Sequence, residues 1–196
     1  GDRANRITLD VYEEMLIRLA DGDRRRWRIE HAQHLHPDDV GRFGELGVVA
    51  AMQPVHCSSD GPWVPLRLGE QRAREGAYVW RALLDQGTVI ASGTDTPVED
   101  VDPIANFYAA VTRRMADGSS FYPTQRMSRE EALRSMTLDA AYAAFEEERK
   151  GSLEVGKLAD ITVLSQDLLT VDEDEIPATR VLATVVGGAV RYTSGP

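Results

Sequence analysis

The chain has 196 residues, of which 42% are hydrophobic and 28% charged, as in a soluble domain that forms a core. Its formal net charge of −10 disfavours binding to a nucleic-acid backbone, and no apolar stretch reaches the roughly 18 residues needed to span a membrane. The single cysteine, Cys57, excludes an intrachain disulfide and fits a cytoplasmic protein.

The first quarter of the chain alternates predicted helices with predicted strands. Apolar residues recur at helical spacing in two segments, and short β-prone runs follow each of them. Such alternation favours parallel strands joined by helical crossovers. The predicted elements are a helix over 9–20 capped by Thr8 and stopped by 21–23, a strand over 27–32, a helix from Pro37 with His36 near its cap, and a buried strand over 48–52. The arginine run 24–26 is interpreted as a solvated loop.

The middle of the chain is rich in prolines and glycines over residues 53–74. So many breakers predict an irregular loop, and a loop of this length is either functional or disordered. A helix over 77–86 and a strand over 88–92 are predicted to follow. A third parallel strand is therefore expected beside the first two.

The last part of the chain changes from a helical to a strand period. Asp102 precedes a predicted helix over 103–115, and Ser128 with Glu131 matches a capping box. Gly187-Gly188 between β-rich runs indicates a hairpin. The remaining predicted elements are helices over 128–136 and 137–146 and strands over 159–164, 179–186 and 189–192.

Three polar side chains follow the three predicted parallel strands. His31 closes the first strand, His56 lies just past the second, and Asp95 follows the third. A neutral imidazole at such a place is a natural zinc ligand, and a carboxylate there can bind a metal and accept a proton from water. Carboxyl ends of parallel strands meet at one edge of a sheet, so the three residues are predicted to converge.

Structural roles remain open for each of these residues. His31 can be a satisfied structural histidine, Asp95 can cap a turn before Pro97, and His56 can be an ordinary loop residue. Cys57 has no base at a fixed spacing beyond its neighbour, which disfavours a nucleophilic role. His34 and His36 are assigned to loop or cap positions.

The arrangement resembles the amidohydrolase superfamily, in the branch of N-substituted formamide deformylase-like and exoenzyme regulatory protein-like members. Matching stretches run through nearly the whole chain in the expected order. They are Gly1-Asp2-Arg3-Ala4-Asn5, Arg28-Ile29-Glu30-His31-Ala32-Gln33, Met52-Gln53-Pro54-Val55-His56, Ser92-Gly93-Thr94-Asp95-Thr96-Pro97-Val98, and residues 150–161, which resemble the superfamily's entry into a small β-sandwich.

The resemblance implies a partial (β/α)8 barrel of metal-dependent hydrolase type over residues 1–148, holding strands six to eight, and the C-terminal strands of a β-sandwich over 149–196. His31 would be a metal ligand, Asp95 a metal ligand and proton shuttle, and His56 a substrate-binding residue. The implied cofactor is a divalent metal ion, most simply zinc. The implied reaction is hydrolysis of an amide- or formamide-like C–N bond in a small molecule.

The same resemblance implies that barrel strands one to five and their metal ligands are missing. We therefore expect the isolated chain to be inactive, with the intact parent as the enzyme. The alternative is a non-catalytic remnant that only self-associates or binds its missing half. Because a cut barrel exposes two sheet edges, a homo-oligomer formed through those edges is expected.

Overall fold

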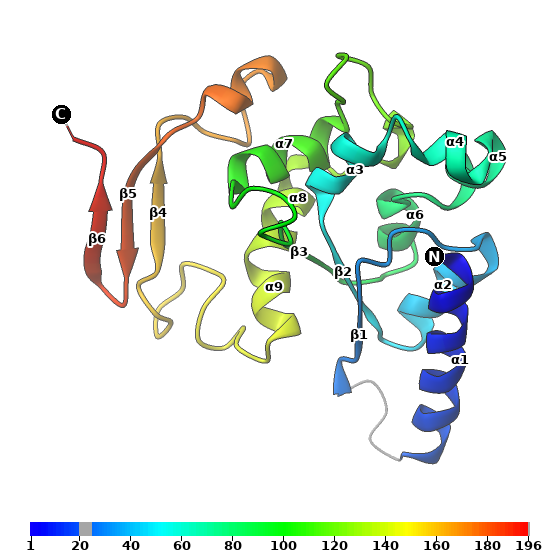
Figure 1. Ribbon diagram of the computed structural model, residues 1–196. Coiled ribbons are helices and arrows are strands. Elements are labelled where there is room, and N and C mark those ends of the chain that lie inside the picture. Colours follow the sequence, from blue (N-terminus) through cyan, green and yellow to red (C-terminus); the bar gives the residue numbers. More distant parts are fainter. Residues whose placement is uncertain (20–24, 196) are drawn as a thin grey trace.

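Two three-stranded sheets, one parallel and one antiparallel, organise the chain (Figure 1). The computed structural model describes residues 1–19 and 25–195. Helices lie around the parallel sheet, and the antiparallel sheet follows at the carboxyl end of the chain. Within these two ranges no helix has the length and apolar character to cross a bilayer. The predicted α/β class is confirmed.

The parallel sheet consists of β1 (Arg28–Glu30), β2 (Val49–Met52) and β3 (Ile90–Ser92), in that order. Ile29 pairs with Ala50, and Ala51 pairs with Ala91. All four residues of β2 are buried, as expected of a central strand covered on both faces. Because the strands are parallel neighbours, the residues that follow them meet at one edge of the sheet.

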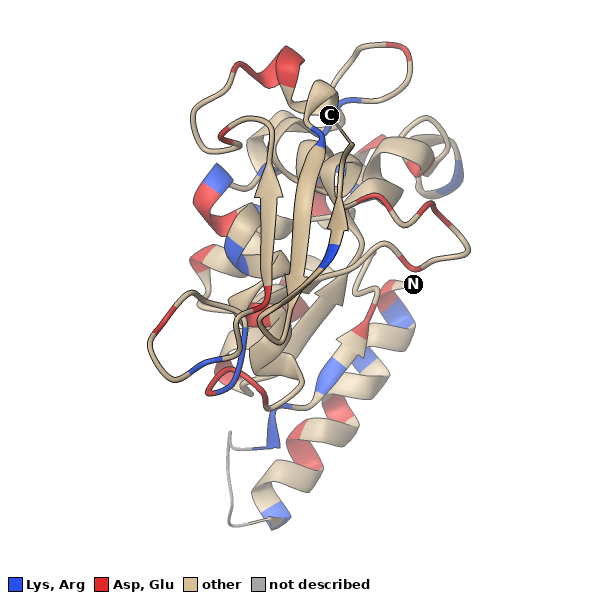
Figure 2. Cartoon of the chain, turned by 90° about the vertical axis from the view of Figure 1, so that its left-hand side faces the viewer, with Lys and Arg blue, Asp and Glu red and all other residues tan. Residues whose placement is uncertain are grey.

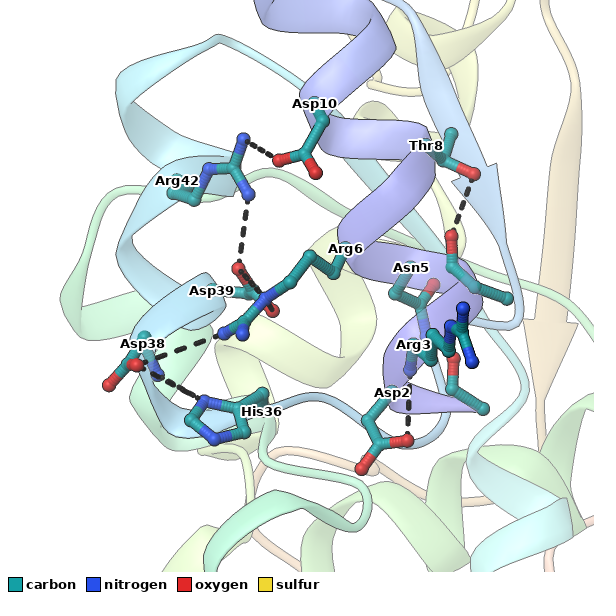
Figure 3. A network of polar contacts seen from close by, with 12 residues as sticks. Asp2, Arg3, Asn5, Arg6, Thr8, Asp10, His36, Asp38, Asp39 and Arg42 are labelled. Atoms are coloured by element: carbon teal, nitrogen blue, oxygen red, sulfur yellow. Dashed lines mark hydrogen bonds and ion pairs between the residues drawn. The ribbon is translucent and has the colours of Figure 1, made fainter.

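A polar network joins helix α1 (Asp2–Arg18) to helix α2 (Pro37–Glu45), as Figure 3 shows. The buried carboxylate of Asp39 accepts from Nε of Arg6 at 2.8 Å and from the guanidinium of Arg42 at 3.1 Å. Arg42 also contacts Asp10 of α1 at 2.8 Å. Charged side chains rather than a broad apolar face therefore dock α1, in which only Asn5 and Leu9 are buried.

The prediction that the first helix starts at Thr8 is wrong. The helix begins at Asp2, with Gly1 as its N-cap, and the hydroxyl of Thr8 donates to the carbonyl of Ala4 inside it. The first two turns are largely polar, and within them Asn5 donates a partly buried hydrogen bond to the carbonyl of His34 instead of contributing apolar surface. Periodicity of apolar residues could not detect them. The predicted end of the helix at residues 20–23 lies outside the described residues.

The prediction of an irregular loop over residues 53–74 is also wrong. Three short helices fill the segment: α3 (Pro54–Asp60), α4 (Val64–Leu68) and α5 (Glu70–Gly76). Pro54 and Pro65 lie in first helical turns, where a missing N–H costs nothing. Gly69, at φ +81°, forms the joint between α4 and α5. The two prolines therefore mark the starts of helices, and Gly69 marks the connection between α4 and α5.

The remaining helices cover the sheet and lead away from it. The predicted capping box of Ser128 with Glu131 is confirmed, and the carboxylate of Asp102, which precedes the predicted helix, accepts from the N–H of Ile104. Each helix is shorter than predicted. The elements are α6 (Trp80–Asp85), α7 (Pro103–Thr112), the 3₁₀ turn η2 (Pro123–Gln125), α8 (Arg129–Met136) and α9 (Leu138–Ala143).

The C-terminal sheet contains β4 (Ile161–Leu164), β5 (Val181–Val186) and β6 (Ala189–Thr193), with the 3₁₀ segment η3 (Glu173–Ala178) between the first two. The predicted hairpin at Gly187-Gly188 is confirmed. Arg191 is the one charged residue of the three strands, which appear almost entirely uncharged in Figure 2.

The core lies between the parallel sheet and the helices that cover it. Trp80, Tyr78, Phe43 and Phe107 are among its largest buried side chains. The buried guanidinium of Arg113 donates to the carbonyls of Tyr78 and Phe121 and lies 4.2 Å from the Trp80 ring centroid. The segment after α7 is thereby fixed to the core.

The arginine run 24–26 is not simply a solvated loop. Arg26 donates to Glu147 at 2.9 Å and lies 3.7 Å from the ring centroid of Tyr142. Arg26 therefore connects the start of β1 to the segment after α9, and no local sequence pattern predicts this contact. Arg24 lies outside the described residues.

Candidate metal centre

His31, His56 and Asp95 converge at the carboxyl edge of the parallel sheet. His31 directly follows β1, His56 lies in the helix that follows β2, and Asp95 comes three residues after β3. One potential ligand atom from each lies within 4.8 Å of the other two. The predicted convergence of the three strand ends is therefore seen in the geometry.

His56 is the most enclosed member of the cluster. The residue is 7% exposed, and its Nε2 has no hydrogen-bond partner within the described part of the chain. That nitrogen lies 3.9 Å from Oδ2 of Asp95. A buried nitrogen without a partner is costly, so this atom is suited to a ligand that enters from outside the chain.

His31 is held where the chain leaves β1. Its backbone N–H donates to the carbonyl of Ala51 at 2.7 Å, and Nδ1 lies 2.9 Å from Oε1 of Gln53. The ring stacks on that of His56, with centroids 6.0 Å apart and planes inclined by 18°. Strand β2 and the residue after it thus fix both the backbone and the side chain of His31.

Asp95 lies in a tight turn. Its φ is +60°, a left-handed conformation that aspartate tolerates better than most residues, and its carbonyl accepts from the N–H of Val98 at 2.8 Å. The side chain is about one-third exposed. The turn therefore presents a carboxylate to the cluster that remains accessible to solvent.

A cavity of about 500 Å³ opens beside the two histidines. One wall carries a compact network in which Oδ2 of Asp60 accepts from Gln33 and from the hydroxyl of Tyr78, both at 2.7 Å. Sequence reasoning missed this network. Asp60 follows His56 by four residues on one helix face, and that spacing is the signal that could have found it.

Burial and contacts describe the surroundings of the other residues singled out in the sequence. His36 is the N-cap of α2, where Nδ1 accepts from the N–H of Asp38. Burial lowers the pKa of His34, which favours the neutral ring. Burial also raises the pKa of Cys57 to about 12, which keeps the sulfur protonated near neutral pH. The disfavoured nucleophilic role of Cys57 is thus opposed by its environment.

The donor set fits a divalent metal ion. Two imidazoles and one carboxylate are ligand types that zinc takes in catalytic sites with an open coordination position. The unpartnered Nε2 of His56 is the structural observation that supports this fit. The cluster also faces a cavity large enough for a small molecule.

Comparison with known proteins gives consistent matches over the whole chain. The sequence profile described as "Amidohydrolase family" matches residues 1–192. "Protein LONG AFTER FAR-RED 3" of Arabidopsis thaliana is 42% identical over 194 residues, covering 98% of this chain and 33% of that protein. "N-substituted formamide deformylase" of Arthrobacter pascens is 29% identical over 192 residues, covering 98% of this chain and 35% of that protein.

Comparison with solved structures also finds a similar metal-dependent hydrolase. The crystal structure of an uncharacterized metal-dependent hydrolase from Pyrococcus furiosus superposes with a TM-score of 0.71 at 34% identity, covering 87% of this chain and 33% of that one. The chain spans about a third of the length of the relatives that it matches.

Proposed function

Because this chain belongs to the amidohydrolase family, we propose that it forms part of a metal-dependent hydrolase that cleaves amide- or formamide-like C–N bonds in small molecules. The observation that carries the proposal is the convergence of His31, His56 and Asp95 within 4.8 Å. The relative named as a formamide deformylase supports the type of bond. The neighbour named as a metal-dependent hydrolase supports the need for a metal ion.

In this proposal His31 and Asp95 hold a divalent metal ion, most simply zinc. The ion, when bound, supplies Lewis acidity that lowers the pKa of water and makes hydroxide available near neutral pH. Asp95 accepts the proton released when water attacks the substrate carbonyl and passes it to the leaving nitrogen. The C–N bond breaks, and a carboxylic acid and an amine are the products. The solvent access of Asp95 supports a residue that exchanges protons.

His56 has two supported roles. As a substrate-binding residue, its buried ring would contact the substrate from the wall of the cavity. The short approach of its unpartnered Nε2 to Asp95 also favours a third metal ligand. Metal affinity separates the two roles, because a ligand is needed before substrate arrives and a substrate contact is not.

We further propose that residues 1–148 form strands six to eight of a (β/α)8 barrel and that residues 149–196 contribute to a β-sandwich. The three parallel strands of the first range and the antiparallel sheet of the second support this division. Further metal ligands would come from a part of the protein outside this chain, and the isolated chain would be inactive. A non-catalytic remnant that only associates with itself or its missing half is the alternative.

The test is a zinc titration of the chain against a chromophoric chelator. His31→Asn and Asp95→Asn should each weaken zinc binding by tenfold or more, because each removes a ligand. His56→Asn should weaken it equally if His56 is a ligand, and leave it unchanged if His56 binds substrate. The matched control is His36→Asn, an exposed N-cap where asparagine also caps well.

Zinc binding that is insensitive to all three cluster variants, or equally sensitive to His36→Asn, would refute the metal centre. In a protein that joins this chain to the proposed missing strands, Asp95→Asn should remove nearly all hydrolysis of an N-substituted formamide while the protein stays folded. Hydrolysis retained at near the original rate would refute the role of Asp95.

A further inference from the structure

Gln53 stands between the two histidines of the cluster. It directly follows β2 and is the N-cap residue of α3, so its backbone starts the helix that carries His56. The carbonyl of Gln53 accepts from the backbone N–H of His56 at 3.0 Å. Its side chain reaches toward β1 instead, and Oε1 lies 2.9 Å from Nδ1 of His31. One residue therefore contacts both histidines through different groups.

The side-chain contact determines which nitrogen of His31 carries the proton. An amide oxygen can only accept, so Nδ1 of His31 must be the N–H that donates to it. A neutral imidazole has one N–H, which leaves Nε2 with a free lone pair. A hydrogen bond of this kind from the second ring nitrogen commonly orients histidine ligands of metals.

The backbone around His31 shows why such a restraint is needed. His31 and Ala32 have φ angles of +69° and +42°, a region that residues with a side chain rarely adopt. The hydrogen bond from His31 N–H to the carbonyl of Ala51 holds the main chain there. It leaves the ring free to rotate, and His31 is exposed to solvent. The contact with Gln53 supplies the missing restraint on the ring.

We propose that Gln53 is a positioning residue of the metal centre, which fixes His31 in the Nδ1–H tautomer and sets the first turn of the helix that carries His56. This inference rests on the proposed function, because it assigns a purpose to the orientation of two members of the candidate centre. Gln53 itself would touch neither metal nor substrate.

The first test reads the tautomer directly in the metal-free chain. Two-bond ¹H–¹⁵N correlation spectra of ¹⁵N-labelled protein at pH 8 distinguish the two neutral forms of each histidine ring. We expect His31 in the Nδ1–H form. Gln53→Leu should remove that preference, and Gln53→Glu should restore it, because a carboxylate also accepts. The reading does not depend on whether the chain binds metal or hydrolyses anything.

The second test measures zinc affinity by chelator competition in the same variants. Loss of a hydrogen bond to a ligand typically costs about 10- to 100-fold in metal affinity, so Gln53→Leu should fall in that range and Gln53→Glu should recover most of it. The matched control is Gln125→Leu, which likewise removes a glutamine side chain whose amide oxygen accepts a hydrogen bond. In this case the donor is the backbone N–H of Ala82. Gln125 lies in η2 and does not line the cavity, so this variant should leave tautomer and affinity unchanged.

An Nε2–H form of His31 in the unmodified chain would overturn the inference, and so would an unchanged tautomer in Gln53→Leu. A zinc affinity in Gln53→Leu within twofold of the unmodified chain would overturn it as well. If neither the unmodified chain nor the protein that joins it to the proposed missing strands binds zinc, the proposed metal centre fails, and the tautomer measurement still decides the role of Gln53.

Discussion

Cys57 illustrates how burial controls chemistry at a single residue. It lies in α3 next to His56, yet the side chain is fully buried, and desolvation raises the pKa of its thiol to about 12. An acid whose pKa is raised on folding stays protonated in the native state. The unfolded chain loses this proton at a lower pH, so the contribution of Cys57 to stability falls as the pH rises from about 8.5 toward 12.

We therefore predict that Cys57 of the folded chain reacts with a thiol reagent at pH 8 at least a hundredfold more slowly than the chain unfolded in guanidinium. The measurement is the rate of reaction with an aromatic disulfide reagent under both conditions. Rapid labelling of the native chain at the rate of a free thiol would contradict the prediction.

Residue types and strand ends were enough to predict the members of the candidate site but not their supports. His31, His56 and Asp95 follow predicted strands, and parallel strands bring their ends together. Gln53 and Tyr78 could not be found in this way, because their importance depends on side-chain directions. Tyr78, for instance, reaches Asp60 from 18 residues away.

At the scale of elements, α2 contains two glycines with opposite expected effects. A Cβ on Gly41 would have ordinary contacts, the nearest 3.7 Å away, whereas a Cβ on Gly44 would lie 2.0 Å from the carbonyl oxygen of Gln86. Gly41→Ala should stabilise the chain by about 0.5–1 kcal/mol through helix propensity. Gly44→Ala should destabilise it by about 1–3 kcal/mol, because backbone must move. Urea unfolding of both variants checks this, and equal signs would contradict it.

The α1–α2 network of Figure 3 gives a second prediction at this scale. The side chain of Asp39 is 2% exposed and bonded to two arginines, whereas that of its neighbour Asp38 is 77% exposed. Asp39→Ala should cost about 2–3 kcal/mol through lost charge-assisted hydrogen bonds. Asp38→Ala should change the free energy of unfolding by less than about 0.5 kcal/mol. Similar losses in both variants would show that α1 is not docked by Asp39.

Element type was more predictable than element length. The three parallel strands, the Ser128 capping box and the terminal hairpin follow from local pattern, and each is present. The helices of residues 53–76 could not be predicted from local pattern, because a proline breaks a helix in its interior but is favourable in its first turn. Pro54 and Pro65 take the second kind of position. Which of these positions a proline takes is decided by packing against the rest of the chain.

At the scale of the whole molecule, family membership agrees with the resemblance carried by the separate motifs, because the match extends over residues 1–192. Neither the proposed barrel nor the proposed β-sandwich can be derived from local pattern, since each would require partner strands for which the local pattern gives no signal. The two outer strands, β1 and β3, each have one neighbour among the described residues.

We predict that the isolated chain associates through these strand edges. Sedimentation velocity across a tenfold range of concentration should show dimers or larger species that dissociate on dilution. Association could instead use the exposed C-terminal sheet, and Val190→Lys tests that alternative by placing a charge on it. This variant should leave association unchanged. A single monomeric species at every concentration would contradict the prediction.

The two sheets differ in burial, and we expect the less buried one to open first. Every residue of β2 is buried, whereas every residue of β6 is exposed. Local opening begins where little apolar surface is lost, so the C-terminal hairpin separates long before β2 does. His31, His56 and Asp95 follow the ends of β2 and its two neighbours, so we expect hydrogen exchange to find the strands that support them still protected after the hairpin has exchanged. We therefore expect the backbone that carries the candidate metal centre to stay in place while the C-terminal hairpin opens.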